Sequence, residues 1–183
     1  MNTMQWGSAM PSGEPQGPRI ERHTIAVLVD NEPGVLARVI GLFAGRGYNI
    51  DSLTVTEVSH EANESRITIV TTGSVEIIDQ IKSQLGRLVP VHGVTDLTVK
   101  GHPIERELAL VKVAGKGEKR VESLRLAEAF RASVVDATTD HFVFEITGRV
   151  SKIDTFIGLM RPLGLVEVAR TGVAAIGRGP DAM

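Results

Sequence analysis

The segment from Asp30 to Leu36, with the sequence DNEPGVL, is the part of this chain best suited to hold a small ligand. Apolar residues at helical spacing begin at Val35, so we predict that a helix starts directly after Gly34. The first N–H groups of a helix have no partner inside it, and with the positive end of the helix dipole they bind small anions such as a carboxylate. A glycine at this turn lets a ligand approach the backbone.

The same residue types also fit a purely structural role. Asn31 is a common helix cap, Pro33 is favoured in a first helical turn and Gly34 is typical of turns. Asn49 and Ile50 follow the predicted end of this helix. They offer a polar contact and an apolar wall to a ligand, and they fit an ordinary strand entry equally well. The residues alone leave both interpretations open.

Catalytic and metal-binding motifs have little support in the sequence. The chain has no cysteine, and no two of its five histidines stand four apart on a predicted helix. The segment 60–64 begins like an HExxH motif but lacks the second histidine, and 115–120 fits a solvated turn better than a phosphate loop. The Gly41-xxx-Gly45 spacing indicates close packing of a helix on a sheet. We therefore expect no catalytic residue, cofactor site or metal site on this chain.

Composition excludes several broad classes of protein. The 183 residues carry 20 Lys and Arg against 22 Asp and Glu, and this near balance disfavours a general nucleic-acid binder. The apolar fraction of 42% supports a packed globular core, which must be aliphatic because only 4% of residues are aromatic. No long apolar run and no targeting pattern is present. We expect a cytoplasmic protein that makes no membrane contact.

The elements that position the segment from Asp30 to Leu36 form a βαββαβ unit. Residues 1–22 hold three prolines and show no apolar periodicity, so we predict a disordered tail there. The elements predicted after it are a strand at 24–30, a helix from Val35 stopped by Gly45 and Gly47, a hairpin of strands 53–56 and 66–72, a helix at 77–88 and a strand at 91–99.

A second unit repeats this order after a junction at Lys100–Pro103. Its predicted elements are a strand at 108–113, a helix at 121–130, a hairpin of strands 134–138 and 142–147, a helix at 153–160 and a strand at 166–174. Corresponding elements are offset by about 75 to 85 residues, which indicates a duplicated domain rather than a solenoid. The predicted fold class is α+β, with two ferredoxin-like βαββαβ domains in tandem after the tail.

Each unit of this topology leaves a sheet face and an edge strand uncovered, which favours self-association, most commonly as a symmetric dimer. The RNA-recognition motif has the same topology but needs aromatic side chains on its sheet. The predicted strand at 66–70 has none, and Phe142 and Phe144 share one face with no aromatic on the adjoining strand. We assign both rings to the core and expect no nucleic-acid binding.

The turn and the segments around it also resemble a known family. Residues 30–39 (DNEPGVLARV) are similar to the amino-acid-sensing turn of ACT domains. Their continuation through 40–43 and 46–53, with 104–108 and 166–172, resembles the regulatory small subunit of acetolactate synthase, also called acetohydroxyacid synthase. The resemblance covers residues 23–179 and leaves out the tail.

The resemblance implies a non-catalytic subunit that activates a catalytic subunit containing thiamine diphosphate, FAD and Mg. It also implies feedback inhibition by valine or a related branched-chain amino acid in the biosynthesis of valine, leucine and isoleucine. The family is expected to form a homodimer with its effector sites at the interface between ACT domains. Carried over to this chain, such a site consists of Asn31, Gly34, Val35 and Leu36, with Asn49 and Ile50 from the neighbouring chain.

The same resemblance assigns residues 23–100 to an ACT domain for effector binding and dimerisation, and 104–179 to the C-terminal ferredoxin-like domain. Pro33 stands at a position that varies in such turns and removes one N–H donor. The alternative is a stand-alone ACT-type amino-acid sensor with a different target, which co-purification with a catalytic subunit would distinguish. A small enzyme on this fold has no supporting set of residues. The sequence leaves open which amino acid is the effector.

Overall fold

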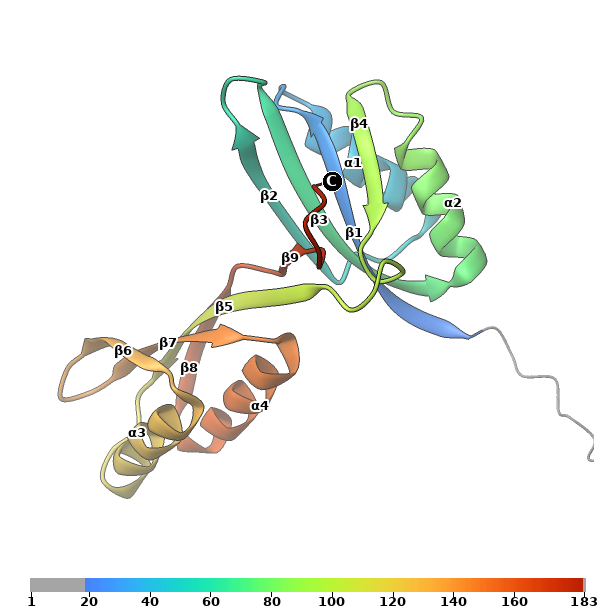
Figure 1. Cartoon of the computed structure of the whole chain (residues 1–183). Coiled ribbons are helices and arrows are strands. Elements are labelled where there is room, and N and C mark those ends of the chain that lie inside the picture. Colours follow the sequence, from blue (N-terminus) through green and yellow to red (C-terminus); the bar gives the residue numbers. More distant parts are fainter. Residues whose placement is uncertain (1–18, 183) are drawn as a thin grey trace, which may run out of the picture.

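The computed structural model describes residues 19–182, and they form two α+β units (Figure 1). The first contains a sheet in the order β2-β3-β1-β4, in which all paired strands are antiparallel. Its elements are β1 (Ile20–Asp30), α1 (Val35–Arg46), β2 (Ser52–Ser59), β3 (Glu64–Ser74), α2 (Val75–Leu85) and β4 (Val91–Asp96). This is the βαββαβ order predicted from the sequence.

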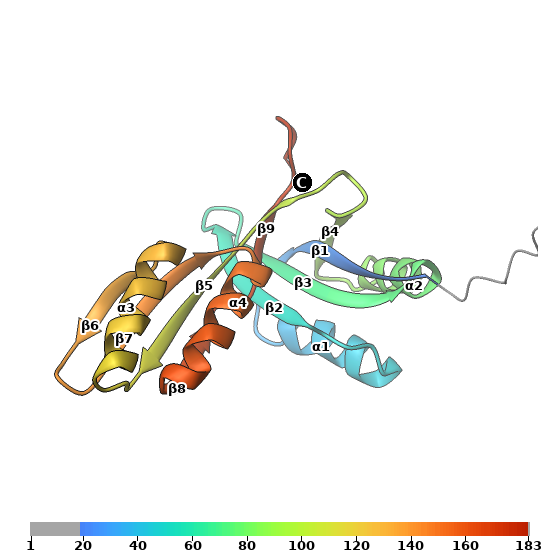
Figure 2. The same ribbon diagram turned by 90° about the horizontal axis from the view of Figure 1, so that it is seen from below.

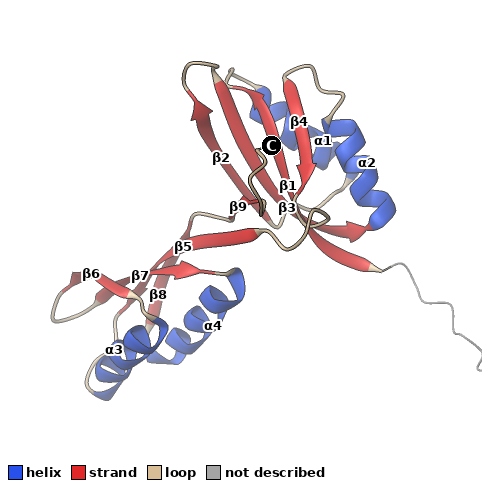
Figure 3. Cartoon of the chain, viewed as in Figure 1, coloured by secondary structure: helices blue, strands red, loops and turns tan. Residues whose placement is uncertain are grey.

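The second unit has the equivalent order β6-β7-β5-β8, and the short strand β9 pairs with the start of β5. Its elements are β5 (Ile104–Val113), α3 (Glu118–Phe130), β6 (Ser133–Ala137), β7 (Phe142–Gly148), α4 (Val150–Met160), the 3-10 helix η1 (Arg161–Leu163), β8 (Leu165–Arg170) and β9 (Ala174–Ile176). The helices of each unit lie on one face of its sheet (Figure 3). The predicted tandem of ferredoxin-like units is confirmed.

Each unit has its own aliphatic core between sheet and helices. In the first, Val35, Val39 and Phe43 of α1 pack on β1 and β3. In the second, Phe142 and Phe144 are 6% and 0% exposed and belong to the core, as expected from the sequence. No ring on this face of the sheet is therefore free to stack on a base.

Several predictions about the first unit need correction. The last strand, predicted at 91–99, ends at Asp96 because a turn follows over 97–100. The predicted tail reached Arg22, but β1 begins at Ile20 because β3 is long enough to pair with residues 20–22. Residues 1–18 lie outside the described part of the chain. Gly41 and Gly45 do not pack on the sheet: both are exposed, and a Cβ at either position would have no atom within 4 Å. The small residues form an open face of α1.

The predicted last strand, 166–174, is also wrong. Strand β8 ends at Arg170, and Gly172 adopts φ +82°, a left-handed conformation that breaks the strand. The chain then runs across the face of the first sheet opposite α1 and α2 (Figures 1 and 2). The end of the second unit therefore lies across part of one face of the first sheet.

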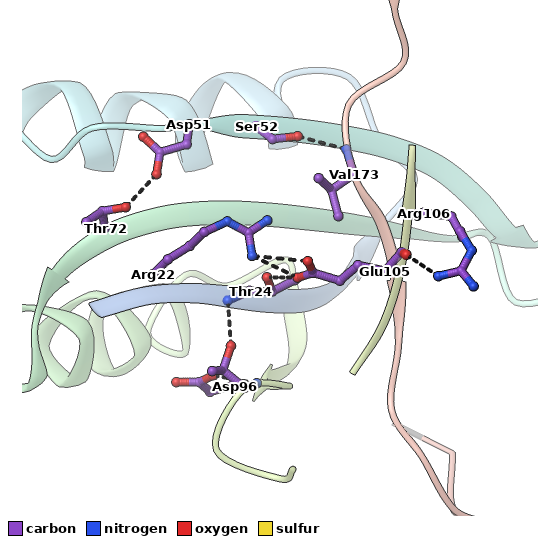
Figure 4. Close-up of polar contacts among 10 residues, drawn as sticks. Arg22, Thr24, Asp51, Ser52, Thr72, Asp96, Glu105, Arg106 and Val173 are labelled. Atoms are coloured by element: carbon purple, nitrogen blue, oxygen red, sulfur yellow. Dashed lines mark hydrogen bonds and ion pairs between the residues drawn. The ribbon is translucent and has the colours of Figure 1, made fainter. Parts of the chain in front are cut away.

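Side-chain contacts join the two units (Figure 4). The guanidinium of Arg22 pairs with Glu105 at 3.1 Å, and the Thr24 hydroxyl donates to the same carboxylate. Below them Asp96 accepts from the backbone N–H of Thr98 at 3.0 Å and fixes the turn that leads to β5. These contacts fix the junction between the units on one side, and the C-terminal segment does so on the other.

Candidate functional site

The turn between β1 and α1 is exposed and open to a ligand. The N–H of Asn31 donates to the carbonyl of Asn63 at 2.7 Å, which ties the turn to the β2–β3 loop. Gly34 is the residue before the helix, with φ +87° and ψ −8°, and a Cβ there would meet no atom within 4 Å. The left-handed conformation favours glycine, while the open space around it leaves room for another molecule.

The start of α1 lacks a capping side chain. No side chain caps the helix, and its first turn contains no acidic residue. The N–H of Arg38 donates to Gly34 at 3.1 Å, but those of Leu36 and Ala37 precede the first intrahelical bond. The Asn31 cap considered from the sequence is therefore absent, since Gly34 stands next to the helix instead. The free N–H groups and the helix dipole suit a carboxylate.

The two apolar residues after Gly34 point in different directions. The Val35 side chain is 3% exposed and belongs to the core, so only its backbone faces the turn. Leu36 is 37% exposed and remains available to a ligand or a second chain. Of these two residues, only Leu36 offers its side chain to a ligand at this end of the helix.

A charged pair that sequence reasoning missed lies beside this turn. His92 Nε2 is 2.6 Å from Asp30 Oδ1, and the hydrogen bond with the Asp30 carboxylate, reinforced by the charges of Asp30 and Glu64, raises the pKa of His92. His92 lies on β4 and Asp30 ends β1. A one-residue irregularity in the β1–β4 register, after Leu28, precedes the pair. No local pattern in the sequence signals this contact.

Asn49 and Ile50 lie at the other end of α1. The helix ends at Gly47, and Asn49 Nδ2 donates to Asp51 Oδ1 at 2.6 Å, which leaves the Asn49 side-chain oxygen available as an acceptor. The Asn49 carbonyl accepts from the Thr71 hydroxyl at 2.7 Å. Ile50 is half-buried against the first core.

One chain does not bring the two halves of the expected site together. The 12 residues of α1 separate Gly34 from Gly47, about 18 Å at 1.5 Å per residue. Asn49 and Ile50 lead into the start of the edge strand β2, whereas the Asn31 turn is tied to the loop at the other end of that strand. The halves therefore lie near opposite ends of one unpaired sheet edge.

Residues 19–182 contain no group of three or more His, Asp or Glu side chains arranged to hold a metal ion. Within that range, no helix is both long and apolar enough to cross a bilayer.

Comparison with known proteins adds to this geometry. Residues 25–93 match the family model of the AHAS small subunit-like ACT domain, and residues 106–179 match that of the small subunit of acetolactate synthase. The chain is 47% identical to the probable acetolactate synthase small subunit of Archaeoglobus fulgidus, over 86% of this chain and 98% of the relative.

Two further relatives agree with this. The small subunit of acetolactate synthase isozyme 3 from Escherichia coli is 42% identical, over 88% of this chain and 99% of the relative. The crystal structure of the acetolactate synthase small subunit from Thermotoga maritima has a TM-score of 0.80 and 38% identity, covering 88% of this chain and 99% of that one. The similarity thus spans both units.

Proposed function

The chain belongs to the acetolactate synthase small-subunit family, and we propose that it regulates its catalytic subunit by binding valine, or a related branched-chain amino acid, at the start of α1. As a member of this family it is a regulatory subunit and not itself a catalyst. It acts in the biosynthesis of branched-chain amino acids. Family membership also favours this reading over a stand-alone sensor with a different target.

The uncapped start of α1 carries the proposal for the effector site. The N–H groups of Leu36 and Ala37 would take the carboxylate of the amino acid, because they are the unpaired donors nearest the turn. The side-chain oxygens of Asn31 and Asn49 would accept from its ammonium group. Leu36 and Ile50 would line the aliphatic side chain, and the buried Val35 would contribute only backbone.

A symmetric dimer would complete this site. Strand β2 is an edge strand with exposed Val55 (42%) and Val58 (49%), and the adjacent α1 exposes Ile40 (38%) beside the open Gly41 and Gly45. An antiparallel pairing of two β2 strands about a two-fold axis would place the start of one strand beside the end of the other.

Such a pairing of β2 strands would explain how one effector site is divided between two chains. It would bring Asn49 and Ile50 of one chain toward the Asn31 turn of its partner, because these lie at opposite ends of β2. The small residues on α1 would allow the two α1 helices to approach closely. Homodimerisation through β2 and α1 and binding of the amino acid are thus one proposal.

The two units would divide the regulatory work. We assign residues 23–100 to effector binding and dimerisation, and 104–179 to the C-terminal ferredoxin-like domain of the subunit. The catalytic large subunit is the expected partner and would carry thiamine diphosphate, FAD and Mg. A cytoplasmic location for the pair stays a prediction, which cell fractionation would test.

Calorimetric titration tests the effector site. We expect the wild-type chain to bind valine and the variants Gly34→Asp and Asn49→Ala to bind at least tenfold more weakly, equivalent to losing about 1.4 kcal/mol. Gly158→Ala, at an exposed position on α4, is the control. Parallel titrations with leucine and isoleucine identify the effector. Unchanged affinity in both variants would rule out this site.

A further inference from the structure

The C-terminal segment is attached to the first unit by two hydrogen bonds to one residue. The N–H of Val173 donates to Ser52 Oγ at 2.8 Å, and the Thr54 hydroxyl donates to the Val173 carbonyl at 3.0 Å. Ser52 and Thr54 lie two apart on β2 and therefore share the face of the sheet opposite the helices. We call Ser52, Thr54, Gly172 and Val173 the Val173 clamp; Figure 4 shows its Ser52 contact.

The clamp is a close contact that depends on glycine. A Cβ on Gly172 would lie 2.9 Å from Ser52 Oγ and 3.0 Å from Thr54 Oγ1, and its φ of +82° disfavours any other residue. The Val173 side chain is only 2% exposed. Backbone and side chain of this residue are thus both enclosed where the two units meet.

The other contacts of the segment with the first unit are few. Arg66 on β3 donates to the Ala175 carbonyl at 2.8 Å, and β9 itself pairs with β5 rather than with the first sheet. Arg22 and Glu105 form a partly exposed ion pair at 3.1 Å. The Thr24 hydroxyl donates to the same Glu105 carboxylate. Because each core lies within its own unit, a change at this junction leaves the packing of both cores in place.

The clamp begins three residues after a proposed effector residue. Asn49 is bound to Asp51, and Asp51 accepts from the Thr72 hydroxyl at 2.7 Å and donates its N–H to Val70. The next residue is Ser52. A ligand that repositions the Asn49 side chain therefore acts on a short, hydrogen-bonded segment that ends at the clamp.

From this placement we infer that the Val173 clamp couples occupancy of the effector site to the position of the second unit relative to the first. The inference rests on the proposed function, because it assigns a route to the regulation exerted by that site. Its thermodynamic basis is differential binding: the amino acid favours the clamped state only as far as it binds that state more tightly. Breaking the clamp should therefore leave the binding of the amino acid unchanged and weaken the inhibition that this binding causes.

The test uses the reconstituted complex of this chain with its catalytic subunit. The double variant Ser52→Ala/Thr54→Val removes both hydroxyls, and Thr56→Val is the matched control. Thr56 lies on the same strand and face, and its hydroxyl contacts only the carbonyl of Glu57 at 3.4 Å. We expect the double variant to bind valine within about threefold of wild type while inhibition by saturating valine falls at least fivefold, the lower end of common allosteric couplings. The control should behave as wild type.

Gly172→Ala gives an independent variant, since its Cβ pushes the clamp apart without removing a hydroxyl. It replaces the double variant if circular dichroism shows that the latter fails to fold. Full inhibition in a folded clamp variant that binds valine would overturn the inference.

A second measurement separates this outcome from failure of the proposed function. Hydrogen exchange of the Val173 amide should slow in wild type on adding valine and should not respond in Gly172→Ala. If wild type does not bind valine at all, the proposed effector function fails. If it binds and is inhibited while Val173 exchange stays constant, only the clamp inference fails.

Discussion

Gly34 and Asn49 flank opposite ends of α1, whose 12 residues span about 18 Å at 1.5 Å per residue. Both are expected to contact the same amino acid, so the proposed account requires them to come from different chains. This gives a test by complementation. Homodimers of Gly34→Asp or of Asn49→Ala should each bind valine poorly, because both of their sites contain a defect.

Mixed dimers of these two variants should regain binding. One of their two sites combines both wild-type halves and the other combines both defects. After denaturation and refolding of an equal mixture, random pairing predicts roughly a quarter of the wild-type number of sites. Calorimetry gives that number directly. A mixture that binds no more valine than the separate variants would mean that one chain builds the whole site.

Replacing Gly34 should lower the stability of the fold because of its backbone conformation. Because its φ is +87°, Gly34→Ala should destabilise the chain by about 1–2 kcal/mol even though the new Cβ meets no atom. Gly158→Ala, on a helix and equally open, should stabilise it by about 0.5–1 kcal/mol. Urea unfolding measures both. Equal effects of the two changes would show that Gly34 does not adopt the left-handed conformation.

Two ion pairs between β5 and β8 should differ sharply in how much they contribute to the stability of the fold. Glu107 is buried, with 4% of its side chain exposed, and Arg170 pairs with it at 2.6 Å and with Asp154 at 2.7 Å. These carboxylates raise the pKa of Arg170, so it stays charged. Arg170→Met leaves a buried carboxylate unpaired and should cost about 3 kcal/mol, or less where water reaches the one-third-exposed arginine side chain.

The matched control for Arg170 is Lys112→Met, which breaks the exposed Lys112–Glu167 pair between the same two strands. It should leave the midpoint of urea unfolding unchanged. Similar shifts in both variants would mean that burial of Glu107 does not matter.

Stability should depend on pH through His92. Its pKa is raised in the folded state by Asp30, so the pair stabilises the fold fully below the unfolded value of about 6.5. That contribution is lost as the pH rises through the higher, folded pKa. The wild type should therefore melt above His92→Gln at pH 5.5, and the two should converge at pH 9. In an Asp30→Asn background the difference at pH 5.5 should disappear; if it persists, another group is responsible.

Most of the fold follows from local patterns in the sequence. Alternation at Ile25, Val27 and Val29 predicted β1, and helical spacing from Val35 to Phe43 predicted α1, because one face of each must be apolar to build the core. The start of β1 was missed since residues 20–22 are stabilised by pairing with β3, a contact that no local pattern records.

The features missed by sequence reasoning depend on tertiary contacts. Gly172 resembles an ordinary turn glycine, and its close approach to Ser52 joins residues 120 positions apart. The His92–Asp30 pair requires the β1–β4 sheet contact. The two halves of the expected site were predicted from family resemblance, whereas their separation along α1 required the structure.

The activity of the cognate catalytic subunit, measured with and without this chain and with and without valine, tests the central claim most directly. We predict that the chain alone makes no acetolactate, that adding it raises the activity of the catalytic subunit, and that valine inhibits only the complex. Catalytic activity and valine response that stay the same after mixing would contradict the regulatory role proposed for this chain.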